Sequence, residues 1–380
     1  MRAVRNAMFL GSALALAACG GAEMDQAAEA DVGQLGAPLH QAAPGLRIDG
    51  DFIVKVKDGA DARAVAAIAG VSPRFEYSII NGFAASLNKG QLTALRQNAD
   101  VEYIEEDAVV QADATQSGAT WGLDRIDQRA LPLNGTYNYT TTASTVTAYI
   151  IDTGLQANHS DFGGRAANVF DAFGGTGADC QGHGTHVGGT VGGVTYGMAK
   201  SVKLRGVRVL DCAGSGSNSG VIAGMDWVRT NGIRPAVANM SLGGGYSSTV
   251  NTSANNLANS GVFLAVAAGN NSADACNYSP ASAASATTVG STTSSDGRSS
   301  FSNFGSCVDI YAPGSSITSA KLNGTYTTMS GTSMASPHVA GAGVLYKGTY
   351  GDASQSTIDT WLKNNATSLS FGKLLYKGAL

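Results

Sequence analysis

The chain has 380 residues, of which 43% are hydrophobic and 14% charged, so it has ample material for a core and fewer charges than an ordinary soluble domain. A net charge of −4 without a long basic run excludes nucleic acid as an expected partner, and no segment is long enough for a membrane-spanning helix.

The first residues are typical of an export signal. Arg2 and Arg5 precede a short apolar run that ends in small residues. Residues 16–20, Leu-Ala-Ala-Cys-Gly, resemble a bacterial lipobox with Cys19 as the lipidated residue. Ordinary signal-peptidase cleavage is the alternative, because Ala-x-Ala patterns occur in the same stretch. We therefore assign 1–19 to a signal peptide with a lipobox and expect a secreted protein whose precursor is lipid-anchored to the bacterial envelope.

Residues 20–45 are rich in Ala, Gly and Gln and are predicted to be a linker. The next segment, 46–113, alternates strand and helix patterns. Strands are expected at 52–57, in two short runs around Asn81-Gly82, and at 101–105, and helices at 61–69 and 91–98. The order β-α-β-β-α-β predicts a small α+β domain of the ferredoxin-like type.

From about Ala114 the apolar runs become continuous. Residues 146–151 and 262–266 are examples, and such runs are typical of strands buried on both faces of a parallel sheet. Helical patterns lie between them, at 219–229, 249–260 and 336–346. Residues 114–380 are therefore predicted to form an α/β domain with a mainly parallel sheet flanked by helices.

Four cysteines remain once Cys19 is set aside, an even number that predicts two disulfides in an exported protein. Three connectivities are possible. Pairing Cys180 with Cys212 and Cys276 with Cys307 closes two loops of similar length, and we favour it.

Asp152-Thr153-Gly154 directly follows a predicted buried strand, at the edge of an open α/β sheet where ligands bind. A carboxylate there must be hydrogen-bonded or functional. Asp-Thr-Gly is also the signature of aspartic peptidases, but these need two such carboxylates and the chain has one copy.

The second motif is Gly-His-Gly-Thr-His at residues 182–186. His183 lies between two glycines, where a helix starts and an imidazole faces a cleft, and it titrates near neutrality as a general base requires. His186 is interpreted as a packed core residue. The spacing of Cys180, His183 and His186 would also suit a metal, but Cys180 is better explained as a disulfide partner.

The third motif is Gly-Thr-Ser-Met-Ala at residues 331–335. Small neighbours leave the Ser333 hydroxyl exposed at a helix N-terminus, where the dipole favours developing negative charge. The motif resembles the nucleophile elbow of α/β-hydrolases, which place Asp or Glu and then His after the serine. Here the only later histidine is His338, so the lipase or esterase interpretation fails on order.

The order Asp, His, Ser is that of subtilisin. Residues 150–154, 182–186 and 331–341 resemble the three subtilase signatures, and the chain is most similar to the proteinase K group, closest to aqualysin. Three further stretches support this likeness: 121–128, 237–245 and 300–303. The resemblance implies a serine endopeptidase with the subtilisin-like fold.

The resemblance also implies roles for individual residues. Ser333 would be the nucleophile, His183 the general base and then acid, and Asp152 the group that orients the imidazolium. Asn270 matches the side-chain oxyanion donor, with a loop asparagine that caps a helix as the alternative. Substrate would pair with two edge segments, made by Gly214, Ser215, Gly216, Ser241, Leu242 and Gly243. Main-chain pairing accepts almost any sequence, so specificity is expected to be broad and mainly apolar.

Aqualysin-like enzymes pair cysteines at the same positions and bind structural Ca2+. The residues that match one family site are Asp309, Ala284 and Ala286, and those that match another are Asp124, Asp127 and Gln128, with Asn134 nearby. Carboxylate and carbonyl oxygens suit this cation, although each carboxylate could instead lie in a surface turn. The loop 173–179 has too few carboxylates for a further calcium site found in some relatives.

The segment 46–113 resembles the inhibitor-type propeptide of this family. A mainly parallel sheet folds slowly, so a folded partner that holds it together and blocks the cleft has a physical basis. We expect self-processing near Asp113-Ala114. Protein and peptide substrates and the propeptide are the expected partners, of a monomer that meets a membrane only through a lipid on the precursor. The alternatives are an inactive subtilase that acts as a binding protein and a lipid-anchored peptidase that acts in place.

Overall fold

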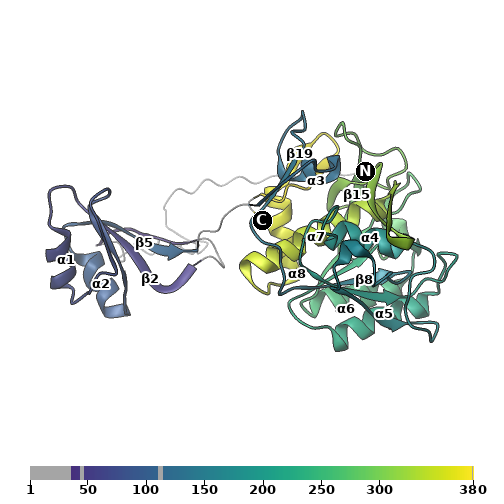
Figure 1. Cartoon of the computed structure of the whole chain (residues 1–380), viewed down its shortest axis with the longest axis horizontal. Coiled ribbons are helices and arrows are strands. Elements are labelled where there is room, and N and C mark those ends of the chain that lie inside the picture. The colour runs from purple at the N-terminus through teal and green to yellow at the C-terminus, as the bar shows by residue number, and fades with distance from the viewer. Residues whose placement is uncertain (1–35, 43–46, 110–113, 379) are drawn as a thin grey trace, which may run out of the picture. The chain divides into compact units, whose positions relative to one another are not determined.

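The computed structural model describes residues 36–42, 47–109, 114–378 and 380. These form a smaller unit that ends at Asp107 and a larger unit that begins at Ala108 (Figure 1). The signal peptide, Cys19 and most of the predicted linker lie outside the described residues. No described helix combines the length and apolar character needed to cross a membrane.

The smaller unit has the predicted β-α-β-β-α-β order. Its elements are β2 (Arg47–Val56), α1 (Ala62–Ile68), β3 (Phe75–Tyr77), β4 (Gly82–Ser86), α2 (Lys89–Gln97) and β5 (Val101–Ala108). Asp61 caps α1, and Asn88 with Gln91 forms a capping box on α2, which explains where both helices begin. Their apolar faces close one core with the sheet.

A further strand, β1 (Leu39–His40), pairs in parallel with β5 at the edge of this sheet. It lies within the range that the sequence assigned to the linker. Ala37 is buried beside it and exchanges hydrogen bonds with Arg96. Regular structure thus begins before residue 46.

A nine-stranded sheet runs through the larger unit in the order β19-β20-β16-β15-β13-β11-β8-β10-β9. Its strands are β8 (Thr147–Asp152), β9 (Ala166–Asp171), β10 (Lys203–Arg208), β11 (Ala236–Met240), β13 (Phe263–Ala267), β15 (Thr287–Thr292), β16 (Ile310–Pro313), β19 (Thr367–Leu369) and β20 (Gly372–Leu374). Neighbouring strands are parallel except β19 and β20. The fold is the expected α/β arrangement.

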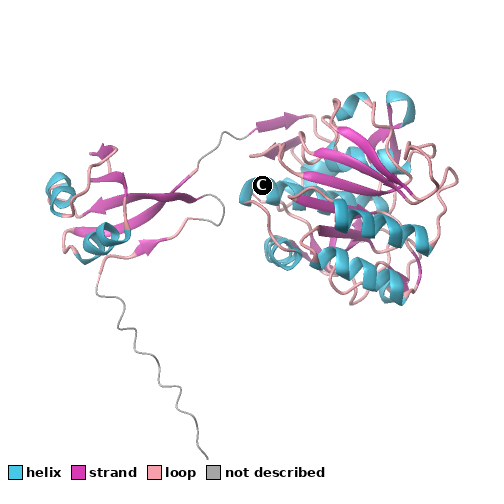
Figure 2. Cartoon of the chain, turned by 90° about the horizontal axis from the view of Figure 1, so that it is seen from below, coloured by secondary structure: helices cyan, strands magenta, loops and turns pink. Residues whose placement is uncertain are grey.

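Helices cover both faces of this sheet (Figure 2). The helices are α3 (Trp121–Asp127), α4 (His183–Gly192), α5 (Asn218–Asn231), α6 (Ser248–Asn259), α7 (Thr332–Tyr350) and α8 (Gln355–Asn365). The apolar run of β8 is continuous because both faces of this strand are buried. Ile150 packs with α4 and α7, while Tyr149 and Ile151 pack with α5 and α6. Burial on both faces removes the alternation.

Three two-stranded ribbons complete the larger unit. They are β6 (Ala114–Ser117) with β7 (Thr136–Tyr139), β12 (Gly244–Gly245) with β14 (Tyr278–Ser279), and β17 (Ile317–Lys321) with β18 (Thr325–Met329). The chain leaves β8 toward β9 and β10 on one side and later continues through β11 and β13 on the other. This change of direction opens a crevice at the carboxyl ends of the strands, which is where α/β proteins bind ligands.

Candidate active site

Asp152 is the last residue of β8, and its side chain is fully buried. One carboxylate oxygen accepts hydrogen bonds from the backbone N–H of Thr153 at 2.7 Å and from Nδ1 of His183 at 2.8 Å. The other oxygen has no hydrogen-bond partner among the described residues. Since a buried charge is costly without partners, Asp152 depends on this contact with the imidazole.

His183 is the first residue of α4. Gly182 before it has a φ of 106°, in the left-handed region that favours glycine, and this turn sets the start of the helix beside β8. Burial opposes protonation of the ring, but the charge and hydrogen bond of Asp152 and the charge of Asp179 outweigh it. The pKa of His183 is therefore raised above its usual value.

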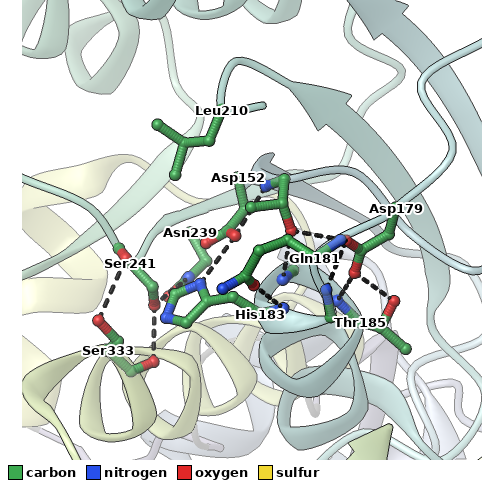
Figure 3. Close-up of polar contacts among 12 residues, drawn as sticks. Asp152, Asp179, Gln181, His183, Thr185, Leu210, Asn239, Ser241 and Ser333 are labelled. Carbon is green, nitrogen blue, oxygen red and sulfur yellow. Dashed lines mark hydrogen bonds and ion pairs between the residues drawn. The ribbon is translucent and has the colours of Figure 1, made fainter. Parts of the chain in front are cut away.

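Ser333 is the second residue of α7. Its Oγ donates to the backbone carbonyl of Ser241 at 3.2 Å, and Oγ of Ser241 donates to the backbone carbonyl of Ser333 at 2.7 Å. That carbonyl is available because Pro337, four residues on, has no N–H to donate. In the view of Figure 3 the ring of His183 is drawn between Asp152 and the two serines. Asp152 and His183 are thus hydrogen-bonded, and Ser333 lines the hollow that adjoins the one lined by His183.

Asn270 follows β13 and reaches the start of α7. Its Oδ1 accepts from the backbone N–H of Thr332 at 2.8 Å and from the Thr332 hydroxyl at 3.0 Å. These bonds fix the amide and leave its NH2 group as a donor. Asn270 and Ser333 line the same hollow, as an oxyanion donor requires.

Two adjoining hollows form the cleft. The first is lined by His183 and by all six predicted substrate-binding residues, namely Gly214, Ser215, Gly216, Ser241, Leu242 and Gly243. The second lies beside Ser333, and its wall carries no charged side chain; it includes Leu242, Ala267, Ala268, Tyr278 and Ala281. A chain laid across both would pass Ser333, which lines the second hollow.

Both disulfides form as favoured, Cys180 with Cys212 and Cys276 with Cys307. The first joins the loop before α4 to the segment that continues into Gly214–Gly216, so the two sides of the first hollow are covalently linked. Cys180 is thereby excluded as a metal ligand. The part of the chain that the structure describes contains no group of three or more His, Cys, Asp or Glu placed to hold a metal.

His186 is a core residue, as the sequence indicated. It is completely buried, and its Nε2 lies 3.2 Å from the backbone carbonyls of Ile317 and Thr327. His338 on α7 is buried in the same layer. Burial lowers the pKa of each imidazole to about 4, so both are neutral near pH 7.

One residue that organises the start of α4 is not predicted from the sequence. Asp179 lies in the loop 173–179, which is poor in carboxylates, yet it accepts hydrogen bonds from Thr153, Gln181, Gly182 and Thr185. A capping signal was available, because an Asp shortly before a helix commonly satisfies its first N–H groups.

The two candidate calcium sites differ in what their carboxylates contact. At Asp127, Oδ2 accepts twice from Asn138, while Oδ1 is buried without a hydrogen-bond partner among the described residues. Asp124 accepts from the backbone N–H groups of Asn134 and Gly135, and Gln128 donates to backbone carbonyls. The buried, unsatisfied oxygen of Asp127 fits a cation ligand.

At Asp309 both carboxylate oxygens have protein partners. Oδ1 lies 2.7 Å from Nζ of Lys363, and Oδ2 accepts from the backbone N–H of Thr288 at 2.8 Å. Lys363 also pairs with Asp359 at 2.7 Å. Ala284 and Ala286 line the same hollow. The ammonium group offsets one of the two negative charges and occupies Asp309 Oδ1, so a calcium ion here would compete with Lys363.

Comparisons with known proteins agree with this geometry. Residues 143–377 match the subtilase family and residues 67–113 match the peptidase inhibitor I9 family. The chain is 52% identical to alkaline serine exoprotease A of Vibrio alginolyticus, over 80% of this chain and 59% of that protein. It is 55% identical to an extracellular serine proteinase of Thermus sp., over 76% of this chain and 71% of that protein.

The chain thus spans 59% of the length of the Vibrio relative. Among solved structures, a cold-adapted subtilisin-like serine proteinase is similar with a TM-score of 0.68 and 53% identity. That likeness covers 70% of this chain and all of the other.

Proposed function

The chain belongs to the subtilase family of serine peptidases, and we propose that it is a secreted endopeptidase that cleaves peptide bonds through an acyl-enzyme at Ser333. One observation carries the proposal: a fully buried Asp152 holds Nδ1 of His183 at 2.8 Å, and the hollow lined by His183 adjoins the one lined by Ser333. A buried carboxylate that holds an imidazole, with a serine at a helix N-terminus nearby, is the arrangement that a Ser-His-Asp triad requires.

In the first step, Ser333 Oγ attacks the carbonyl carbon of the scissile bond and its proton passes to Nε2 of His183. The hydroxyl donates to the Ser241 carbonyl in this structure, and in this step it would donate to the imidazole instead. Asp152 stabilises the imidazolium through Nδ1. His183 then gives the proton to the leaving amine, and water repeats the sequence to release the acyl group.

The tetrahedral intermediates carry negative charge on the former carbonyl oxygen. We assign its stabilisation to the Asn270 side-chain NH2 group and the Ser333 backbone N–H. Asn270 is held from its carbonyl side by two Thr332 donors, so its NH2 group does not need to reorganise as charge develops. The N-terminus of α7 adds a favourable dipole.

Broad, mainly apolar specificity follows from the two hollows. Main-chain atoms of the segments 214–216 and 241–243 would pair with an extended substrate whatever its side chains. The uncharged second hollow, about 330 Å³, would take one apolar side chain next to the scissile bond.

We further propose that the inhibitor-type unit is a propeptide removed by the enzyme itself near Asp113-Ala114. Asp113 lies outside the described residues, and β6 begins at Ala114, paired with β7. The match to the I9 inhibitor family supports this role.

Structural calcium is proposed at the Asp124, Asp127 and Gln128 site, where the unsatisfied Asp127 oxygen fits a cation. The Asp309 site with Ala284 and Ala286 would bind calcium only if Lys363 moved away. When bound, the ion would contribute stability by mass action.

Secretion is proposed from the N-terminal signal and from a relative described as extracellular. A lipid on Cys19 would hold the uncut precursor at the membrane and leave the cut enzyme free. The Ser333→Ala precursor should then pellet with membranes and the Cys19→Ser, Ser333→Ala precursor should not. A soluble precursor with Cys19 intact would instead indicate ordinary signal cleavage.

The function is tested with internally quenched peptides. The full-length chain should hydrolyse peptides with an apolar residue before the scissile bond and lose activity to a serine-directed inhibitor. The inhibitor should label Ser333, as mass spectrometry of the digested protein would show. Hydrolysis that persists with Ser333 labelled, or no hydrolysis of any peptide by processed protein, would contradict the proposal.

A further inference from the structure

Each of the first two catalytic motifs contains a buried threonine that the mechanism does not use. Thr153 follows Asp152, and Thr185 lies two residues after His183; both are fully buried. Their hydroxyls donate to the same carboxylate, Thr153 to Oδ1 of Asp179 at 2.9 Å and Thr185 to Oδ2 at 2.6 Å (Figure 3). Asp179 therefore connects the end of β8 to the start of α4.

Asp179 also holds the backbone at the start of α4. It accepts from the N–H groups of Gln181 at 3.0 Å, Gly182 at 2.8 Å and Thr185 at 2.9 Å. With the two hydroxyls this makes five donors on one carboxylate. The first N–H groups of a helix have no partner within the helix, and Gly182 at the cap position has no side chain to offer.

The remaining N–H groups of this turn complete the same network. His183 donates its N–H to Oε1 of Gln181 at 2.7 Å, and Gly184 donates to Oγ1 of Thr153 at 2.9 Å. The backbones are also in close contact, because a side chain at Gly184 would approach the carbonyl oxygen of Gly154 within 2.2 Å. Little movement of His183 relative to Asp152 is possible while Asp179 is in place.

The charge of Asp179 acts on the same ring. The charged groups that raise the pKa of His183 are Asp152 from β8 and Asp179 from the loop before α4. His186 on α4 is neutral near pH 7, because burial lowers its pKa to about 4. From α7, Ser333 faces the ring and is uncharged. Removing the Asp179 charge should therefore make His183 lose its proton at lower pH.

We propose that Asp179 is a positioning residue for the catalytic pair, fixing His183 against Asp152 through Thr153, Thr185 and the first N–H groups of α4. The proposal rests on the peptidase function proposed above. Asp179 lines neither hollow of the cleft, so its effect should appear in kcat and in the pH profile more than in KM.

Two substitutions separate position from charge. Asp179→Asn keeps the size of the side chain but removes the charge, whereas Asp179→Glu keeps the charge and displaces it by one methylene. Both should lower kcat by about ten- to a hundredfold, the order expected for a small displacement of a catalytic group. Only Asp179→Asn should move the acid limb of kcat/KM to lower pH. Asp171→Asn is the matched control, because Asp171 accepts from Phe173 and Gly177 and pairs with Arg208 without contacting α4.

A readout independent of activity uses the full-length Ser333→Ala chain. The His183 pKa is measured by NMR titration, with the ring signal assigned by its loss in His183→Ala. Adding Asp179→Asn should lower this pKa and adding Asp171→Asn should not. If Asp179→Asn changes only the melting temperature and leaves kcat, the acid limb and the His183 pKa unchanged, Asp179 is purely structural and the proposal is wrong. If the parent chain hydrolyses no peptide, the peptidase function fails while the titration still decides the role of Asp179.

Discussion

His183 and His186 lie on the same helix, one turn apart, in two regions with opposite environments. His183 faces the cleft with two carboxylates nearby, and its pKa is raised. His186 faces the layer between α4, α7 and the β17–β18 ribbon, where it meets backbone carbonyls, and burial lowers its pKa to about 4. The difference shows that the position of a charged partner, rather than the residue type, decides whether a histidine in this motif exchanges protons or packs.

The largest expected effect is the loss of activity when His183, in the first region, is removed. His183→Ala should reduce kcat by about 10⁴-fold or more, because it removes the base that takes the Ser333 proton. The precursor should remain uncut, since cleavage near Ala114 is proposed to be the enzyme's own reaction. Activity against a quenched peptide and the size of the protein on a gel measure both effects.

The matched change in the second region is His186→Gln, which keeps a side-chain donor for the two carbonyls. It should lower the free energy of unfolding by about 1–3 kcal/mol and change kcat by less than a few-fold. Denaturant unfolding of the Ser333→Ala background separates this stability effect from autolysis. A loss of kcat as large as that of His183→Ala would show that the two regions are not distinct.

The two regions should also respond to pH with opposite signs. His186 and His338 have folded pKa values of about 4, below their unfolded values near 6.5, so the unfolded state binds protons first as pH falls. Their contribution to stability is complete above about pH 6.5 and is lost toward pH 4, by up to about 3 kcal/mol each. His183, with a raised pKa, contributes stability below about pH 6.5 that is lost as pH rises through its folded value.

As the pH falls from 7 to 4, His186 and His338 destabilise the folded state and His183 stabilises it. We therefore expect a net loss of stability, measured by unfolding the Ser333→Ala chain at each pH. In the His183→Ala, Ser333→Ala chain the loss between pH 7 and pH 5 should be steeper. A shallower loss would contradict the assigned signs.

The sequence predicted the parts of the fold that depend on local pattern. Continuous apolar runs predicted β8 and β13, and the motif at the carboxyl end of β8 predicted a functional role for Asp152, whereas the role of Asn270 was implied by the resemblance to subtilases. A helical pattern is predicted at 336–346 with Ser333 at a helix N-terminus, and α7 begins at Thr332. Pro337 lies inside this helix, and Ser241 Oγ donates to the Ser333 carbonyl that Pro337 leaves free. Asp179 and Lys363 were missed as partners because their contacts depend on how separate segments pack, which no local spacing reports.

The last comparison concerns two carboxylates that differ as the two histidines do, by the partner that each one contacts. Asp127 has a buried oxygen without a hydrogen-bond partner among the described residues, and Asp309 is paired with Lys363. Calcium at Asp127 should stabilise the folded state by about 2.7 kcal/mol when its free concentration is a hundred times Kd.

We therefore expect chelation to lower the melting temperature of the Ser333→Ala chain. Asp127→Asn should remove most of that response and Asp309→Asn little of it, because Lys363 already supplies a positive charge at the second site. If Asp309→Asn removes the larger part, calcium displaces Lys363 and the ranking of the two sites is reversed; a melting temperature that is indifferent to chelator would count against both.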